Sequence, residues 1–249
     1  MSGHSHWSGI KYKKALNDAK RGKTWSKVAR MIIVAARNGG GDPSANLSLR
    51  YAIDKGKAAN MPKDTIEKAV KKGTGGLEGV NYEEILYEGY GPSGVAIMVE
   101  TLTDNRNRTA PEIKRIFEKH GGSLGTTGCV GWMFHKKGLI TVNTSAIDEE
   151  QLMDIALGAG ASDMKTAGDV FEITCEPGAF EGLKKALLQK EITPVIAEIS
   201  MVPQSNVEIR DEHVAARVVS LMEAFDDHDD VQNAYANFDI PGEIMAKIS

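Results

Sequence analysis

Residues 139–201, LITVNTSAIDEEQLMDIALGAGASDMKTAGDVFEITCEPGAFEGLKKALLQKEITPVIAEISM, contain the order of elements that decides the fold. Short runs predict strands and amphipathic stretches predict helices, in the order 139–142 (strand), 148–158 (helix), 162–166 (strand), 170–174 (strand), 178–190 (helix) and 195–201 (strand). The order βαββαβ is typical of the split βαβ, or ferredoxin-like, fold. We therefore predict a ferredoxin-like domain over residues 136–204.

The two segments that flank this domain complement each other. The first predicts a ββαβ order with a GPSG turn between its first two strands: 85–90 (strand), 95–102 (strand), about 109–120 (helix) and 129–134 (strand). The second predicts an amphipathic helix at about 207–225 and a strand at about 231–235. Because the second segment supplies the αβ that the first lacks, we expect a middle α/β domain in two pieces, 81–135 and 205–249, with the ferredoxin-like domain inserted in it.

Charge is divided unequally between the two ends of the chain. Residues 1–80 contain 16 Lys and Arg against 6 Asp and Glu, whereas residues 81–249 contain 14 against 28, so their net charges are +10 and −14. Such an asymmetry indicates binding to nucleic acid or to a membrane surface, because clustered cations release condensed counterions from phosphates. We expect residues 1–80 to form a domain that binds a polyanion.

This basic segment predicts four helices, at about 10–20, 23–38, 44–59 and 62–73. The second is the best defined, because its apolar residues recur at helical spacing from Trp25 to Ala36 and form a single face. Its Lys and Arg residues fall on the opposite side. Since Trp25 belongs to the apolar face, we expect it in the core.

Basic and aromatic residues near the N-terminus form the candidate nucleic-acid site, with Asp18 as the single acid among them. Cationic groups neutralise phosphates, and an exposed aromatic ring can stack on an unpaired base. The candidate cations are Lys11, Lys13, Lys14, Lys20, Arg21, Lys23, Lys27, Arg30 and Arg37. Trp7 and Tyr12 are added as candidates that either contact bases or pack in the core. Lys68, Lys71 and Lys72 also have a structural explanation, because cations at the C-terminal end of a helix favour its dipole.

Three other segments are candidates for function. In TDNRNRT, residues 103–109, Arg106 and Arg108 oppose the dipole of the helix that begins there, so we expect them to contact a phosphate or an acidic partner. The glycine-rich HGGSLGTTG, residues 120–128, predicts a loop that is either mobile or closely approached by a partner. The acidic DDHDD, residues 226–230, lacks the alternating oxygens and the glycine of a calcium loop, so we expect a solvated turn.

The sequence lacks the common enzyme and metal motifs. Gly89, Gly91 and Gly94 match GxGxxG, but a strand follows them, so we expect a hairpin turn. The histidines are scattered, and Cys129 and Cys175 lie far apart, so no metal, cofactor or disulfide is expected. No apolar run has the length of a signal sequence or a membrane span. We expect a cytoplasmic protein that is not an enzyme and has no membrane partner.

Five long stretches carry a resemblance to a known family: GHSHWSGIKYKKALNDAKRGKTWSKVAR (3–30), AARNGGGDPSAN (35–46), AIDKGKAANMPKDTIEKAVKKGTG (52–75), YEGYGPSGVAIMVETLTDNRNRT (87–109) and KHGGSLGTTG (119–128). They resemble the YebC/PmpR family, which includes the mitochondrial translational activator of cytochrome oxidase. The resemblance implies a basic N-terminal helical domain followed by two ferredoxin-like α/β domains. Together with the order of elements it predicts an α+β fold in which the last domain is inserted into the middle one.

The resemblance also implies a regulatory protein, and it leaves two targets open. Members of the family are labelled as DNA-binding transcriptional regulators, and they are also linked to translation on ribosomes that stall at proline-rich stretches. We find no helix-turn-helix with polar base-reading residues at a helix start, so binding to a DNA duplex would be mostly non-specific. Structured ribosomal RNA can be recognised through its shape and phosphates. DNA and the ribosome both stay open as partners, and the sequence specifies no oligomeric state.

Overall fold

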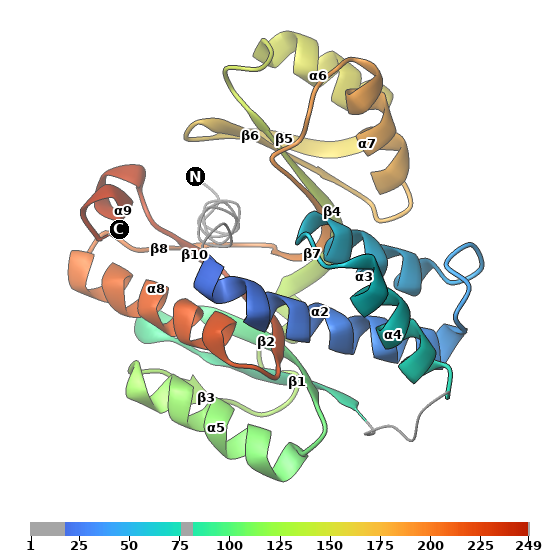
Figure 1. The fold of residues 1–249 in the computed structure, drawn as a ribbon. Helices are drawn as coiled ribbons and strands as arrows, with labels where there is room; N and C mark the ends of the chain where they lie inside the picture. The colour runs from blue at the N-terminus through green and yellow to red at the C-terminus, as the bar shows by residue number, and fades with distance from the viewer. Residues whose placement is uncertain (1–17, 76–81, 249) are drawn as a thin grey trace.

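The computed structural model describes residues 18–75 and 82–248, with only the backbone for 18–23. Three helices precede two four-stranded antiparallel sheets, and each sheet has helices on one face (Figure 1). The predicted α+β class is therefore confirmed. The helix predicted at about 10–20 lies outside the described residues as far as Asn17.

Residues 18–75, which we call the helical unit, pack α2 (Asp18–Gly39) against α3 (Leu47–Ala58) and α4 (Lys63–Gly73). The apolar face predicted for α2 forms much of its core, whose buried residues are Val28, Ile32, Ile33, Ala36, Leu49, Ala52, Met61, Ile66 and Ala69. Trp25 packs against this core, and its Nε1 donates a hydrogen bond of 2.9 Å to the carbonyl of Ala59. The expected core position of Trp25 is confirmed, and its one polar group is satisfied there.

Asn46 fixes the connection between α2 and α3. Its Oδ1 caps α3 by accepting the backbone N–H of Leu49 at 3.0 Å. Its Nδ2 donates to the carbonyls of Ala35 and Gly40, both at 2.8 Å, at the end of α2. One buried side chain thus caps α3 and ties its start to the end of α2.

The central sheet has the strand order β3-β1-β2-β9. Its strands are β1 (Glu83–Tyr90), β2 (Ala96–Thr103), β3 (Ser123–Leu124) and β9 (Val231–Ala236). Helices α5 (Arg106–Lys119) and α8 (Glu212–Asp227) cover one face, where the rings of Phe117 and Phe225 meet edge to face with centroids 4.8 Å apart. A 3-10 turn, η1 (Pro92–Gly94), joins β1 to β2, which confirms the hairpin predicted from the glycines.

The strand predicted at 129–134 is wrong. The chain forms turns there, including a 3-10 turn η2 (Gly131–Met133), and the third strand of the central sheet is the short β3, which pairs with the end of β1. The physical reason is the buried carboxylate of Glu88, which accepts the backbone N–H groups of Val130 and Gly131 in this segment and that of Gly128 just before it. Those N–H groups are therefore unavailable to a neighbouring strand.

The inserted sheet has the strand order β5-β6-β4-β7, with every neighbouring pair antiparallel. Its elements are β4 (Phe134–Asn143), α6 (Glu149–Gly158), β5 (Ala161–Ala167), β6 (Val170–Cys175), α7 (Phe180–Gln189) and β7 (Ile196–Pro203). Both helices cover one face, with Leu152, Leu183 and Leu187 fully buried between the layers. The βαββαβ order predicted from residues 139–201 is confirmed, and we call residues 134–203 the inserted unit.

The C-terminal segment completes the central sheet and adds elements that the sequence analysis did not predict. Two short parallel strands, β8 (Val207–Glu208) and β10 (Phe238–Asp239), pair beside α8, and α9 (Gly242–Ile248) follows. None of the described helices is long and apolar enough to cross a membrane. We propose a division into domains 1–80, 81–135 with 205–249, and 136–204, because the helical, central and inserted parts each have a buried core.

Gly73 ends α4 at its contact with α2, which makes the packing testable. A β-carbon at this position would lie 2.4 Å from the carbonyl oxygen of Ile33 and 2.7 Å from the β-carbon of Ala36. Because the two helices would have to separate, we expect Gly73→Ala to lower the free energy of unfolding by about 1–3 kcal/mol. Thermal unfolding followed by circular dichroism measures the change.

Gly182 of α7 is the matched control. A β-carbon there has no other atom within 4 Å, so Gly182→Ala removes only the flexibility of a helical glycine. We expect it to raise the free energy of unfolding by about 0.5–1 kcal/mol. Shifts of the same sign and size in the two variants would contradict close packing at Gly73.

Candidate nucleic-acid interface

The predicted nucleic-acid site lies partly outside the described side chains. Trp7, Lys11, Tyr12, Lys13 and Lys14 precede the described residues, and for Lys20, Arg21 and Lys23 only the backbone of α2 is described. The described candidates are Lys27, Arg30, Arg37, Arg106 and Arg108. Three of these five converge on a single segment of residues 82–133 and 204–248, which we call the central unit.

That segment is Asp226–Asp230, which we call the acidic segment and which comprises the end of α8 and the turn before β9. Lys27 of α2 donates from Nζ to the carbonyl of Asp226 at 2.5 Å. Arg30 of the same helix donates to the carbonyl of Asp229 at 2.7 Å and to Oδ1 of Asp230 at 3.0 Å. The face of α2 that lies opposite its apolar face is therefore docked on the acidic segment at these two residues.

Asp230 is the centre of this contact. Its side chain is only 4% exposed, and its Oδ2 accepts hydrogen bonds from Arg108 at 2.7 Å, Thr109 at 2.7 Å and Thr103 at 3.2 Å. With Arg30 on Oδ1, charged and hydroxyl donors compensate the buried carboxylate. The expectation of a solvated turn is wrong for Asp230, because the cations that bury it come from distant parts of the sequence.

The donors around Asp230 keep it ionised. Burial, the largest single influence, raises its pKa, but the hydrogen bonds from Arg108 and Thr109 and the charges of Arg108 and Arg30 together lower the pKa below the usual value for aspartate. The hydrogen bond to Asp230 is in turn the main cause of a raised pKa for Arg108. An ion pair thus joins α5 to the acidic segment, and a second one joins α2 to it.

Arg106 and Arg108 lie in different surroundings although they are close in sequence. Asn105 caps α5 by accepting the backbone N–H of Arg108 at 3.2 Å. The guanidinium of Arg108 contacts Asp104 at 3.0 Å as well as Asp230, whereas the side chain of Arg106 is exposed. The acidic partner of Arg108 is therefore internal, and Arg106 stays a candidate for an external phosphate.

Glu112, His228 and Asp230 could be read as a metal site, because each offers a ligand atom within 4.8 Å of the others. However, Nε2 of His228 already lies 3.0 Å from the carboxylate of Glu112. The carboxylate of Asp230 is held by two guanidinium groups, whose positive charges oppose a bound cation. We interpret the cluster as an internal charge network and assign no metal to it.

The helical unit presents other cations on α4. Lys68 and Lys71 are exposed and Lys72 is half-buried, and the i, i+3 and i+4 spacing places them on neighbouring surface positions. Buried Ile66 and Ala69 occupy the side of α4 that packs in the core. We call the three lysines the α4 cations. Helix-dipole stabilisation explains their position in the sequence, but they also extend the positive surface of the unit.

Glu88 holds the glycine-rich loop, and sequence reasoning did not single it out. Its residue is 4% exposed, and its carboxylate accepts backbone N–H groups from Gly128 at 2.7 Å, Val130 at 2.8 Å and Gly131 at 2.6 Å. Burial raises the pKa of Glu88, but these three hydrogen bonds outweigh it, and the pKa is lowered. The available signal was a single carboxylate within the otherwise uncharged stretch 85–90 of β1.

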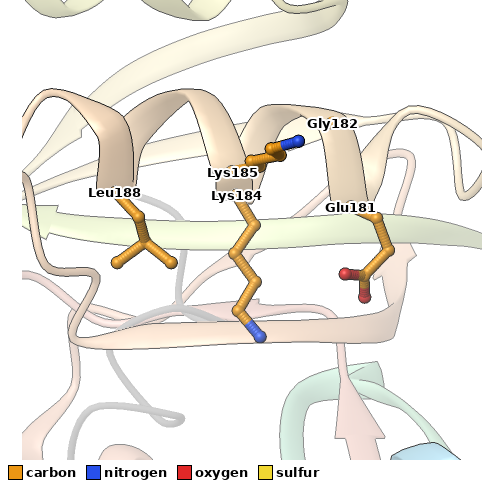
Figure 2. A pocket seen from close by; sticks show the side chains of 5 residues that line it. All are labelled: Glu181, Gly182, Lys184, Lys185 and Leu188. Carbon is orange, nitrogen blue, oxygen red and sulfur yellow. The ribbon is translucent and has the colours of Figure 1, made fainter.

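Two surface hollows lie in different parts of the described chain. The larger, about 680 Å³, lies between α2, α3 and the central sheet, and Glu84 and Glu100 are among its lining residues, which include no Lys or Arg. The smaller, about 410 Å³, lies along α7, where Leu188, Lys184 and Glu181 point to the same side of the helix (Figure 2). The larger hollow does not suit a phosphate, because its charged groups are carboxylates.

The network around Asp230 predicts a pH-dependent contribution to stability. We expect Asp230→Asn to lower the free energy of unfolding at pH 7 by about 1–3 kcal/mol, because two arginines lose a charged acceptor. The folded-state pKa is lowered, so the carboxylate stabilises the fold above its unfolded pKa of about 3.9, and this contribution is lost as the pH falls through the folded-state pKa. The difference in Tm between wild type and variant should therefore shrink in acid.

Asp229→Asn is the control, because Asp229 is exposed and contacts Arg30 through its backbone carbonyl, which the substitution retains. We expect it to change the free energy of unfolding by at most about 0.5 kcal/mol. Thermal unfolding at several pH values measures both variants. Equal Tm values for wild type and Asp230→Asn at pH 7 would contradict the role given to this carboxylate.

Comparisons with known proteins agree over the whole chain. A family model described as the TACO1/YebC N-terminal domain matches residues 5–76, and a model of the TACO1/YebC second and third domains matches residues 82–238. Proteins named "Probable transcriptional regulatory protein" from Syntrophobacter fumaroxidans and Elusimicrobium minutum are 54% and 52% identical, with 100% of each chain covered. The crystal structure of a conserved hypothetical protein from Aquifex aeolicus is 46% identical, with a TM-score of 0.81 over 92% of this chain and 94% of that one. The chain belongs to the TACO1/YebC family.

Proposed function

We propose that this protein is a non-catalytic, cytoplasmic regulatory protein that binds nucleic acid through its basic N-terminal helices, and that it acts as a DNA-binding regulator of transcription. The name carried by its relatives supports the regulatory role. The observation that carries the proposal is the charge of the helical unit, which contains 13 Lys and Arg against 5 Asp and Glu in residues 18–75.

The candidate cations differ in whether they must break an existing contact within the protein before they can bind a phosphate. Lys27, Arg30 and Arg108 are engaged with the acidic segment, so a phosphate has to displace that contact to reach them. The cations proposed for direct contact are Lys11, Lys13, Lys14, Lys20, Arg21, Lys23, Arg37, Arg106 and the α4 cations, with Trp7 and Tyr12 as aromatic candidates. Phosphate contacts of this kind supply affinity and orientation rather than sequence specificity.

The contribution of the α4 cations can be measured through salt dependence. Replacing Lys68, Lys71 and Lys72 together with Glu should weaken binding to a DNA duplex and reduce the steepness of log Kd against log salt by about 2.7, at about 0.9 per phosphate contact. Replacing Lys13, Lys14, Lys20 and Arg21 with Glu should abolish retention on DNA. Fluorescence anisotropy with a labelled duplex at several salt concentrations measures both.

The matched control replaces Lys184, Lys185 and Lys190 with Glu. These substitutions make the same change of charge in the middle of α7 and at its C-cap residue, in the inserted unit, and Figure 2 shows Lys184 and Lys185 on that helix. We expect the control to retain the wild-type salt slope to within about 0.9, the value of one contact. A wild-type slope near zero would exclude phosphate-driven binding altogether.

The choice between DNA and ribosomal RNA as the cellular target requires a separate experiment. The protein is crosslinked to nucleic acid in cells, and all bound DNA and RNA is sequenced. Discrete peaks at promoters support the proposed role in transcription. Enrichment of ribosomal RNA without promoter peaks would replace it with a role on the ribosome.

A further inference from the structure

Trp132 is exposed beside the glycine-rich loop. Its side chain lies in η2, and the residue is 65% exposed, the highest value among the large hydrophobic residues of the described chain. Its Nε1 donates to the carbonyl of Cys129 at 3.2 Å, and the hydroxyl of Tyr90 donates to the same carbonyl at 3.1 Å. The indole is thus tied to the loop while most of its ring faces solvent.

The backbone around Trp132 is held from inside the protein. Gly131, its neighbour, donates its N–H to the buried Glu88 carboxylate at 2.6 Å, and Val130 does so at 2.8 Å. Val130 is itself fully buried, in a cluster with Met98 of β2 and Phe134 of β4. A fixed aromatic ring loses little conformational entropy when it binds a ligand.

Trp132 and helix α2 lie over the same face of the central sheet. Met98, Glu100 and Leu102 alternate with residues that face α5 and α8, so all three point to the opposite face. Met98 packs against Val130 of the Trp132 segment, whereas Glu100 and Leu102 line a hollow together with residues of α2. The Trp132 ring and the helical unit therefore lie on the same side of the central sheet, so one ligand can contact both while its phosphates stay outside the hollow lined by Glu84 and Glu100.

The surroundings of Trp132 favour a nucleic-acid base over an apolar protein surface. Its exposed sequence neighbours are Thr126 and Thr127 on one side and His135 and Lys136 on the other. The core of a protein interface is apolar and poor in charge, whereas stacking on a base requires one accessible ring face and benefits from a cation near the phosphate.

We propose that Trp132 stacks on an unpaired base of the nucleic acid that the helical unit binds. The inference rests on the proposed function and adds a contact that distinguishes single-stranded from duplex ligands. A single-stranded DNA segment and an RNA loop offer the same ring chemistry. Loss of one stacked base typically lowers affinity about 5- to 150-fold.

The test compares Kd values for a 12-nucleotide single-stranded DNA, the RNA of the same sequence, and the corresponding DNA duplex. We expect Trp132→Ala to weaken binding to single strands by about 5- to 150-fold and to leave duplex binding within about twofold, whereas Trp132→Phe retains most of the affinity. Tighter binding of RNA than of DNA identifies RNA as the source of the base. Leu188→Ala, at a residue 50% exposed on α7, is the control for removal of a large exposed side chain.

A second readout reports the ring directly. In a variant with Trp7→Phe and Trp25→Phe, Trp132 is the remaining tryptophan, and a stacked base should quench its fluorescence. If the wild-type protein binds the duplex but Trp132→Ala binds single strands as tightly as the wild type does, this inference is overturned and the proposed function stays intact. The absence of fluorescence quenching has the same meaning. No wild-type binding to any of the three ligands overturns the proposed function itself.

Discussion

The buried carboxylate of Asp230 is the contact on which the arrangement of the helical and central units depends. It binds Arg30 of α2 and Arg108 of α5 at the same time, and the two hydroxyls of Thr103 and Thr109 complete its surroundings. Removing either guanidinium group leaves the buried carboxylate of Asp230 less compensated, which costs more than an exposed ion pair is worth. The positive face of α2 is thus partly used inside the protein, whereas the α4 cations lie outside this contact.

The protein has a net charge of −4 although its N-terminal end is strongly basic. Part of that basic end contacts the acidic part of the chain within the protein. The acidic part of the chain supplies the acidic segment, and α2 is held there by Arg30, whose side chain is 21% exposed, and by Lys27. Salt screens exposed charges more than buried ones. Rising ionic strength should therefore weaken the binding of a phosphate to the exposed lysines of α4 before it weakens the contact between the helical and central units.

The sequence predicted helices and strands correctly where the pattern that determines them is local. The predictions failed where a residue distant in the sequence determines the local structure. Helical periodicity placed Trp25 in the core, and the order of strands and helices in residues 139–201 predicted the inserted unit. The strand predicted at 129–134 failed because Glu88, some forty residues earlier in the chain, takes its backbone N–H groups. The prediction of a solvated turn failed at Asp230 because one of the cations that bury this carboxylate, Arg30, lies 200 positions away in the sequence. Clustering of cations in sequence likewise could not reveal which of them face an internal carboxylate.

Glu88 and Asp230 are both buried carboxylates, but their partners give them different roles. Glu88 is compensated by backbone N–H groups of one short segment, which no other anion can take without refolding the loop. Asp230 is compensated by side chains, and Arg108 is 44% exposed, so a phosphate can approach the same guanidinium groups. The loop that carries Trp132 is therefore a fixed feature of the central unit, whereas the docking of α2 is a contact for which a polyanion can compete. In the proposed complex, the fixed Trp132 ring sets the position of a base, and the α4 cations hold phosphates without displacing the contact at Asp230.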